Sequence, residues 1–126
     1  MSALKPEDCD ALMYQAITAR DLEAAVSLYE TDASFVLDDG HVAVGHDAIR
    51  EVLRPFMTVE DFKFTKQPVA FISAQNDLAL LRGTWSATRI GEGGGREAIG
   101  GNNIEIVRRQ SDGSWKFVVD HPSGAD

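Results

Sequence analysis

The chain has 126 residues, of which 44% are hydrophobic and 25% are charged, and its formal net charge is −8. This composition is typical of a soluble globular protein, so we expect one domain over residues 1–126. The negative charge argues against nucleic acid and anionic membranes as partners, because both attract positively charged surfaces. A lone cysteine, no signal peptide and no long apolar span favour a cytoplasmic protein.

Apolar side chains at helical spacing predict three helices in the first half of the chain. The first covers about residues 6–19 and begins with a proline and two acids, which suit a first helical turn. The second is capped by Asp21 and has an apolar stripe that reaches Tyr29. The third begins near Asp47 and ends or kinks near Pro55.

Two short β-prone runs flank Asp39 and Gly40, a pair that favours a two-residue hairpin turn. Such a turn places Asp38 opposite His41 at an exposed tip. We interpret these two side chains as a surface ion pair rather than a catalytic site. A metal site would need further ligands, and the spacing here matches no compact metal motif.

After residue 60 the pattern changes to strands, predicted at about residues 61–66, 69–74, 78–90, 97–109 and 114–121. Asp112 and Gly113 indicate a second two-residue hairpin turn. The glycine-rich residues 91–97 are interpreted as a flexible loop, because a phosphate-binding loop would stand between a strand and a helix. Three helices followed by antiparallel strands predict an α+β fold with the helices on one face of a curved sheet.

The stretch "ARDLEAAVSLYETDASFVLDDGHVAVGHDAIREVL" and the C-terminal "RRQSDGSWKFVVDHPSGAD" resemble the superfamily of ketosteroid isomerases, SnoaL-like cyclases and nuclear transport factor 2. The resemblance spans nearly the whole chain and rests on caps, turns and core positions. It implies a cone-shaped antiparallel sheet wrapped around three N-terminal helices. It also implies an apolar pocket inside the cone and a homodimer formed through the outer face of the sheet. Nothing in the motifs calls for a cofactor or a metal ion.

Isomerases of this superfamily use a carboxylate base, a tyrosine and a protonated aspartic acid. Aligned without gaps, the base position falls on Leu37, the tyrosine position on Met13 and the aspartic acid position on Glu105. Two of the three positions therefore depart from the pattern, and we do not expect steroid isomerisation. Tyr14 lies one residue from the tyrosine position, about 100° around the helix, and stays a candidate for reaching the pocket.

Glu105 and Asp120 are the candidate catalytic acid and base. A two-residue turn in the last hairpin places Glu105 directly opposite Asp120, with Val107 opposite Val118 on the same face. Like charges in such a pair repel, so in a dry pocket the two carboxyl groups would share a proton. A shared proton can be given and taken back, which is what enolisation of a carbonyl compound needs.

Six residues are candidates for contacting a ligand in the pocket: Tyr14, Leu37, Trp85, Asn103, Val107 and Val118. On a strand beside the acid pair, Arg82 would keep both carboxyl groups ionised if it faced the same way. Four apolar residues alternate onto one face of the last two strands and indicate a surface that needs a partner: Ile104, Ile106, Phe117 and Val119.

Two functions stay open. The first is binding of a small, mostly apolar organic molecule in the cone, with carboxyl-assisted proton transfer of the kind that isomerases, cyclases and lyases perform. The second is a non-catalytic dimeric interaction or scaffold domain. A carboxyl group or histidine buried in an open pocket favours the enzyme, whereas a cone filled with side chains favours the scaffold.

Overall fold

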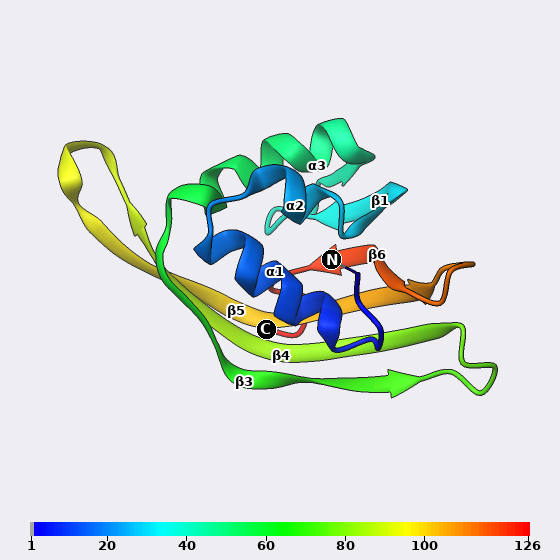
Figure 1. The fold of residues 1–126 in the computed structure, drawn as a ribbon. Helices are drawn as coiled ribbons and strands as arrows, with labels where there is room; N and C mark the ends of the chain where they lie inside the picture. The colour runs from blue at the N-terminus through cyan, green and yellow to red at the C-terminus, as the bar shows by residue number, and fades with distance from the viewer. Residues whose placement is uncertain (1) are drawn as a thin grey trace.

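The computed structural model describes residues 2–126 as an α+β fold, in which helices cover one face of a single curved sheet (Figure 1). The helices are α1 (Asp8–Thr18), α2 (Leu22–Val26) and α3 (His46–Leu53), with the 3-10 helices η1 (Arg54–Thr58) and η2 (Glu92–Gly94). The strands are β1 (Tyr29–Val36), β2 (Val42–Val44), β3 (Glu60–Ile72), β4 (Leu78–Ile90), β5 (Arg96–Arg109) and β6 (Trp115–His121).

The six strands form one sheet in the order β2-β1-β6-β5-β4-β3. Every pair is antiparallel except β1 with β6, which run parallel. The chain therefore returns at its end to the strand with which the sheet began, and β6 lies at the centre of the sheet. Within residues 2–126, no helix has both the length and the apolarity to cross a membrane.

The concave face of the sheet is covered chiefly by α1 (Figure 1). Its buried side chains include Cys9, Met13 and Ile17, which follow the predicted apolar stripe. The second helix is shorter than predicted. Asp21 caps it by accepting a hydrogen bond from the backbone N–H of Ala24 at 3.1 Å, but the helix ends at Val26. Tyr29, predicted on the stripe of that helix, instead begins β1 and is fully buried.

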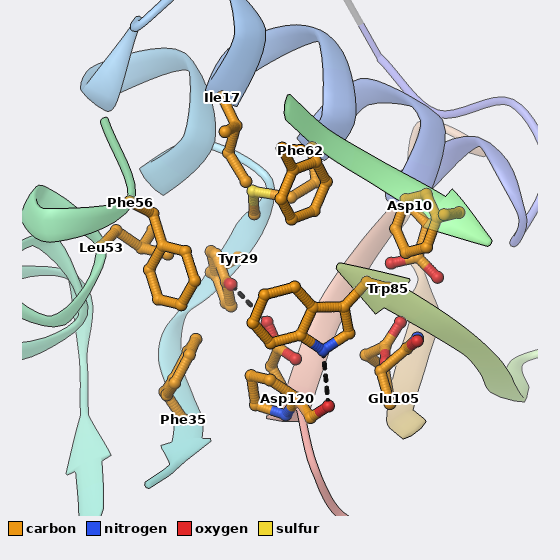
Figure 2. A pocket seen from close by; sticks show the side chains of 14 residues that line it. Asp10, Ile17, Tyr29, Phe35, Leu53, Phe56, Phe62, Trp85, Glu105 and Asp120 are labelled. Carbon is orange, nitrogen blue, oxygen red and sulfur yellow. Dashed lines mark hydrogen bonds between the residues drawn. The ribbon is translucent and has the colours of Figure 1, made fainter. Parts of the chain in front are cut away.

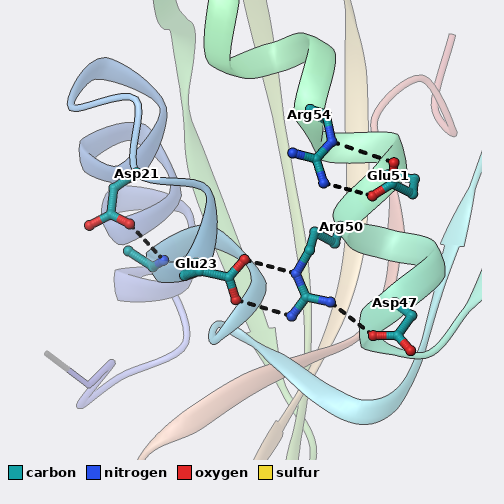
Figure 3. Close-up of polar contacts among 7 residues, drawn as sticks. Asp21, Glu23, Asp47, Arg50, Glu51 and Arg54 are labelled. Carbon is teal, nitrogen blue, oxygen red and sulfur yellow. Dashed lines mark hydrogen bonds and ion pairs between the residues drawn. The ribbon is translucent and has the colours of Figure 1, made fainter.

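A surface network joins α2 to α3 (Figure 3). The guanidinium of Arg50 donates two hydrogen bonds to Glu23, at 2.8 and 3.0 Å, and a third to Asp47 at 2.9 Å. Arg54 pairs with Glu51 one turn further along α3. Exposed ion pairs contribute roughly 0–1 kcal/mol each, so this network orients the two helices more than it stabilises them.

The strands predicted at residues 61–66 and 69–74 form a single strand, β3. The prediction of a break between them was wrong, although Pro68 lies there and cannot donate a backbone hydrogen bond. The strand continues because β3 is at the edge of the sheet and its pairing with β4 shifts register between Lys66 and Val69. At an edge, a missing donor and a β-bulge interrupt the pairing on one side only.

The first hairpin turn has three residues instead of the predicted two. The backbone N–H of Leu37 donates to the carbonyl oxygen of His41 at 2.8 Å. The backbone N–H of Gly40 donates to the carbonyl oxygen of Leu37 at 2.9 Å. Gly40 takes a φ of 89°, which a side chain would disfavour. His41 is therefore paired with Asp39, at 2.9 Å between Nδ1 and Oδ2, and the predicted partner Asp38 was wrong.

The outer face of the sheet carries a row of directly paired, mostly apolar residues that crosses all six strands: Val44, Ser34, Val119, Ile106, Leu80 and Phe71. Ile104 lies on the same face one pair away from Ile106. Phe117, predicted on this face, is on the inner face and stacks against Tyr29 with ring centroids 4.9 Å apart. Phe71 and Val44, at the two ends of the row, are 53% and 61% exposed, and the four residues between them are half-buried.

We predict that the protein is a homodimer through this outer row, because a contiguous exposed apolar surface favours a symmetric partner. Sedimentation at tens of micromolar should give twice the mass of the chain. Ile106→Lys, which places a charge in the middle of the row, should shift the protein toward monomer. Leu4→Lys is the matched control, since Leu4 is 79% exposed but lies outside the row. A wild-type monomer at this concentration would contradict the prediction.

Candidate functional site

The concave face of the sheet and the helices enclose a cavity of about 50 Å³ (Figure 2). Most of its wall is aromatic or aliphatic, and its polar groups gather at the α1 and β5–β6 side. The lining residues are Asp10, Met13, Ile17, Tyr29, Phe35, Leu53, Phe56, Phe62, Phe64, Trp85, Asn103, Glu105, Asp120 and Pro122. Every helix and strand except α2, β2 and the short η2 supplies at least one of them, so the cavity exists only in the assembled fold.

Glu105 lies directly opposite Asp120 in the β5–β6 ladder, as predicted. The turn of this hairpin, however, has three residues, because Gln110 pairs with Ser114 through a 2.6 Å hydrogen bond. On its own that turn would move the pairing by one position. A register shift between Val107, which pairs with Phe117, and Ile106, which pairs with Val119, restores the predicted pairing of Glu105 with Asp120.

Val118 is consequently the extra residue of a β-bulge rather than the partner of Val107, and that predicted pairing was wrong. A bulge places two residues of one strand against one residue of the other and changes which face the following side chains take. Here it turns both Phe117 and Asp120 to the inner face of the sheet, where they are 1% and 8% exposed.

Asp120 accepts a hydrogen bond from the hydroxyl of Tyr29 at 2.5 Å (Figure 2). The two side chains come from adjacent parallel strands, β1 and β6, and both are buried. Tyr29 has one hydroxyl proton to donate and donates it here, so Tyr29 orients the Asp120 carboxyl group and supports its ionised form.

Glu105 is held from two sides. The amide nitrogen of Asn103, two residues earlier on β5, donates to Glu105 Oε2 at 2.7 Å. On the other side is the carboxyl group of Asp10 from α1, which Figure 2 shows above Glu105. Asp10 Oδ2 and Glu105 Oε1 are buried and have no donor from another described residue. Two ionised carboxylates in this position would repel each other, so the neighbouring Asp10 charge favours the protonated form of Glu105.

Burial raises the pKa of all three carboxyl groups, because the charged form loses its hydration. It raises the pKa of Asp10 to about 6, although the hydrogen bond with Glu105 acts in the opposite direction. The pKa of Glu105 lies well above its usual range, through burial first and the neighbouring charges of Asp10 and Asp120 next. For Asp120, burial raises the pKa to about 7 against the lowering effect of the Tyr29 hydroxyl. Among the described residues, no Lys, Arg or His side chain lines the cavity.

Aromatic rings form the opposite wall of the cavity. Trp85 packs against Phe56 and Phe62, with ring centroids 5.8 Å apart in each pair, and Phe64 meets Phe62 at 5.6 Å. The indole N–H of Trp85 donates to the carbonyl of Pro122 at 2.7 Å, which fixes the ring in place. A ligand in the cavity would therefore meet apolar faces on one side and carboxyl groups on the other.

A second hollow of about 320 Å³ lies beside Arg20, Glu60 and Arg96. Its volume is larger than that of the cavity, but both of its cationic side chains already have partners. The Arg20 guanidinium donates to the carbonyl of Met57, and Arg96 pairs with Glu60 at 2.8 Å. Both cations are thus already engaged, and none of the buried carboxyl groups lines this hollow.

Four of the residues selected from sequence line the cavity: Trp85, Asn103, Glu105 and Asp120. The other four, Tyr14, Leu37, Val107 and Val118, are not among the lining residues. Tyr14 is 41% exposed and lies on the outward side of α1, and Val107 is packed in the core. Arg82 is exposed on the outer face, with its guanidinium 5.5 Å from the centre of the Phe71 ring. Its charge therefore lies on the opposite side of the sheet from the acid pair.

Sequence reasoning missed two polar residues of the site, Asp10 and Tyr29. No role was assigned to Asp10 from the sequence. Its spacing of three and seven residues from Met13 and Ile17 puts it on the buried stripe, and an acid on such a stripe is the signal that could have found it. Tyr29 was missed because its spacing also continued the pattern of α2.

Over residues 2–126, no group of three His, Cys, Asp or Glu side chains has an arrangement that could hold a metal ion. The three cavity acids instead form a cluster in which Glu105 is a neighbour of both Asp10 and Asp120. Chemically, such a set can hold and move protons.

Solved structures share this fold at low sequence identity. A ketosteroid isomerase-like protein from Erwinia carotovora is 22% identical, with 95% of this chain and 93% of that one covered and a TM-score of 0.79. A nuclear transport factor 2-like superfamily protein from Salmonella enterica is 16% identical, with 94% and 89% covered and a TM-score of 0.74. A nuclear transport factor 2-like protein with a cystatin-like fold from Novosphingobium aromaticivorans is 20% identical, with 95% and 79% covered and a TM-score of 0.71.

Similarity at these identities shows the fold and not the activity. None of the curated proteins is significantly similar to the chain in sequence. Residues 11–118, in contrast, match the family described as the SnoaL-like domain, and this range includes the aromatic wall, Tyr29 and Glu105. The chain therefore belongs to the SnoaL-like domain family.

Proposed function

We propose that the protein binds a small, mostly apolar organic molecule in the cavity and transfers a proton on it, with Glu105 and Asp120 as acid and base. The observation that carries the proposal is their direct opposition in the wall of a largely apolar cavity. A carboxyl group with a pKa near the working pH is both a competent acid and a competent base. Isomerases, cyclases and lyases that act next to a carbonyl group use this chemistry.

The two carboxyl groups suit different roles. Asp120, with a pKa of about 7 and a Tyr29 hydrogen bond that supports its ionised form, is the base that takes a proton from carbon. Glu105, whose pKa also lies well above its usual range, is the acid that gives its proton to the carbonyl oxygen and leaves an enol. Asp120 then returns its proton to the same carbon or to a different one, and Glu105 takes its proton back from the enol oxygen. Both carboxyl groups are thereby restored. Asn103 and Asp10 hold Glu105 in place from either side.

The rival function, a non-catalytic scaffold, predicts a cone filled with apolar side chains. A scaffold gains nothing from buried carboxyl groups, since burying ionisable groups without basic partners destabilises a fold. Asp10, Glu105 and Asp120 are 4%, 2% and 8% exposed and line an open space, which favours the enzyme.

Carboxyl titration by NMR tests the acid pair. We expect at least two carboxyl transitions far above the usual value of about 4 for Asp and Glu. Glu105→Gln should remove one of these raised transitions, and Asp120→Asn should lower the Glu105 pKa, because the Asp120 charge contributes to raising it. Asp112→Asn, on the exposed turn of the same hairpin, should leave the cavity transitions unchanged. Ordinary values that do not respond to either cavity substitution would remove the basis for the proposal.

The raised pKa values also predict how stability depends on pH. Between the unfolded value near 4 and the folded value of about 7, the folded protein binds more protons at Asp120 than the unfolded chain does, so this group makes stability fall as pH rises. Asp120→Asn retains the acceptor for Tyr29 but cannot ionise. Urea unfolding should therefore show that the variant loses about 1–3 kcal/mol less than wild type between pH 5 and pH 8. Glu92→Gln, on the exposed tip of the β4–β5 hairpin, serves as the control, and parallel profiles for wild type and Asp120→Asn would contradict the assignment.

We predict no appreciable isomerase activity on Δ5-3-ketosteroids. Leu37 and Met13 occupy two of the three positions at which such isomerases carry polar groups, and the loss of a positioned base alone costs roughly 10²–10⁴-fold in rate. The cavity of about 50 Å³ is also small, since an engineered cavity of about 150 Å³ is what holds a single benzene ring. A spectrophotometric assay of conjugated-enone formation provides the measurement, and rapid turnover would show that the assignment of roles is wrong.

A further inference from the structure

We infer that the molecule bound in this cavity carries a positively charged aliphatic amine in addition to the group on which proton transfer acts. The inference rests on the proposed function, because it names the chemical class of the molecule that the same cavity binds. It arises from the hydrogen-bonding groups of the wall, its charge and its aromatic surface.

The hydrogen-bonding groups of the wall are unbalanced in one direction. Each side-chain donor atom makes one hydrogen bond: the Tyr29 hydroxyl to Asp120, one N–H of the Asn103 amide to Glu105 and the Trp85 indole N–H to the Pro122 carbonyl. The buried polar atoms of the wall that lack a protein partner are all oxygens, namely Asp10 Oδ2, Glu105 Oε1 and Asn103 Oδ1. A carboxyl oxygen can satisfy itself by retaining a proton, whereas the amide oxygen of Asn103 can only accept a hydrogen bond and still needs a donor.

Asn103 makes this need specific. The residue is 4% exposed and lines the cavity, so its free carbonyl oxygen cannot be paired by bulk solvent. An ammonium group has only donors and can bond to this oxygen and to a carboxylate at once. A ligand carboxylate or phosphate has only acceptors and would meet the same oxygens with repulsion.

The charge of the wall points the same way. Asp10, Glu105 and Asp120 bring three acidic groups together, and among the described residues no basic side chain lines the cavity. At neutral pH at least Asp10, with a pKa of about 6, is predominantly ionised. A buried charge without a partner is unfavourable, and a ligand cation would supply the missing partner.

Aromatic rings complete the match on the other side. The ring centroid of Trp85 lies 5.8 Å from those of Phe56 and Phe62, and Figure 2 shows Trp85 beside Glu105 and Asp120, with Phe56 and Phe62 on the other side of the indole. The faces of such rings attract cations, and carboxylates together with aromatic rings are a recurrent arrangement for ammonium recognition. The volume of about 50 Å³ limits the body of the ligand to a few carbon atoms unless a ring moves.

Three near-isosteric probes test the inference on the intact protein: isobutylamine as its hydrochloride, isobutanol and sodium isobutyrate. Binding is followed at pH 7.5 by NMR shifts of the Trp85 indole N–H, with sodium chloride added to equalise ionic strength. We expect isobutylamine to bind at least 10-fold more tightly than isobutanol and isobutyrate to bind least. Asp10→Asn, which removes a charge with little change of shape, should weaken the amine at least 10-fold and leave the alcohol unchanged. Asp8→Asn on the same helix, outside the cavity wall, should not alter amine binding.

Equal binding of the amine and the alcohol would overturn the inference and leave the proposed function standing, since a neutral molecule would then occupy the cavity. Preferential binding of isobutyrate would overturn it as well and would indicate that the protonated acids act as donors. Absence of binding by every probe would also count against an ammonium ligand. The carboxyl titrations decide the proposed function separately, because they need no ligand.

Discussion

The feature on which the site depends is the burial of carboxyl groups between α1 and the β5–β6 pair without a basic partner. Asp10 and Asp120 come from elements at opposite ends of the chain, and both lie beside Glu105 in the folded protein. Ionised carboxylates in such a place repel one another and lose their hydration. Protons must therefore be retained, and a set of acids that retains protons at neutral pH is able to exchange them with a ligand.

Two structural devices make this burial possible. The β-bulge at Val118 turns Asp120 inward, and Tyr29 then donates to it from the neighbouring parallel strand. Asn103 provides the corresponding donor for Glu105. Each carboxyl group thus has at least one defined neighbour, so the acids have fixed positions. Fixed positions matter for catalysis, because a proton donor or acceptor must lie within hydrogen-bond reach of the reacting atom.

The two faces of the sheet have separate roles. The inner face provides the cavity and its acids, whereas the outer face presents a mostly apolar row from Val44 to Phe71 and carries Arg82 over the Phe71 ring. Alternation of side chains along a strand is what separates the roles, since neighbours in sequence point to opposite faces. Arg82 is only three residues from the cavity residue Trp85, yet the sheet lies between its charge and the acids of the cavity.

Much of this architecture could be predicted from the sequence by itself. Helical spacing predicted α1 and α3, strand patterns predicted β4, β5 and β6, and the resemblance predicted the family, which the match of residues 11–118 confirms. The opposition of Glu105 and Asp120 was also predicted, although the reasoning assumed a two-residue turn. The three-residue turn and the bulge displace the register in opposite directions, so their errors cancel at that pair.

The tertiary structure alone decided which other residues share the site. Pairing within a hairpin depends on residues close in sequence, so spacing can predict it. The contact of Asp10 with Glu105 depends on how α1 is placed on the sheet, and that placement results from packing of side chains across the whole core. The same holds for Tyr29, whose spacing suited either a helix or a strand until its parallel pairing with β6 buried it beside Asp120. The sequence by itself thus determined the elements, the family and one acid pair, and the packing of distant elements determined the cavity.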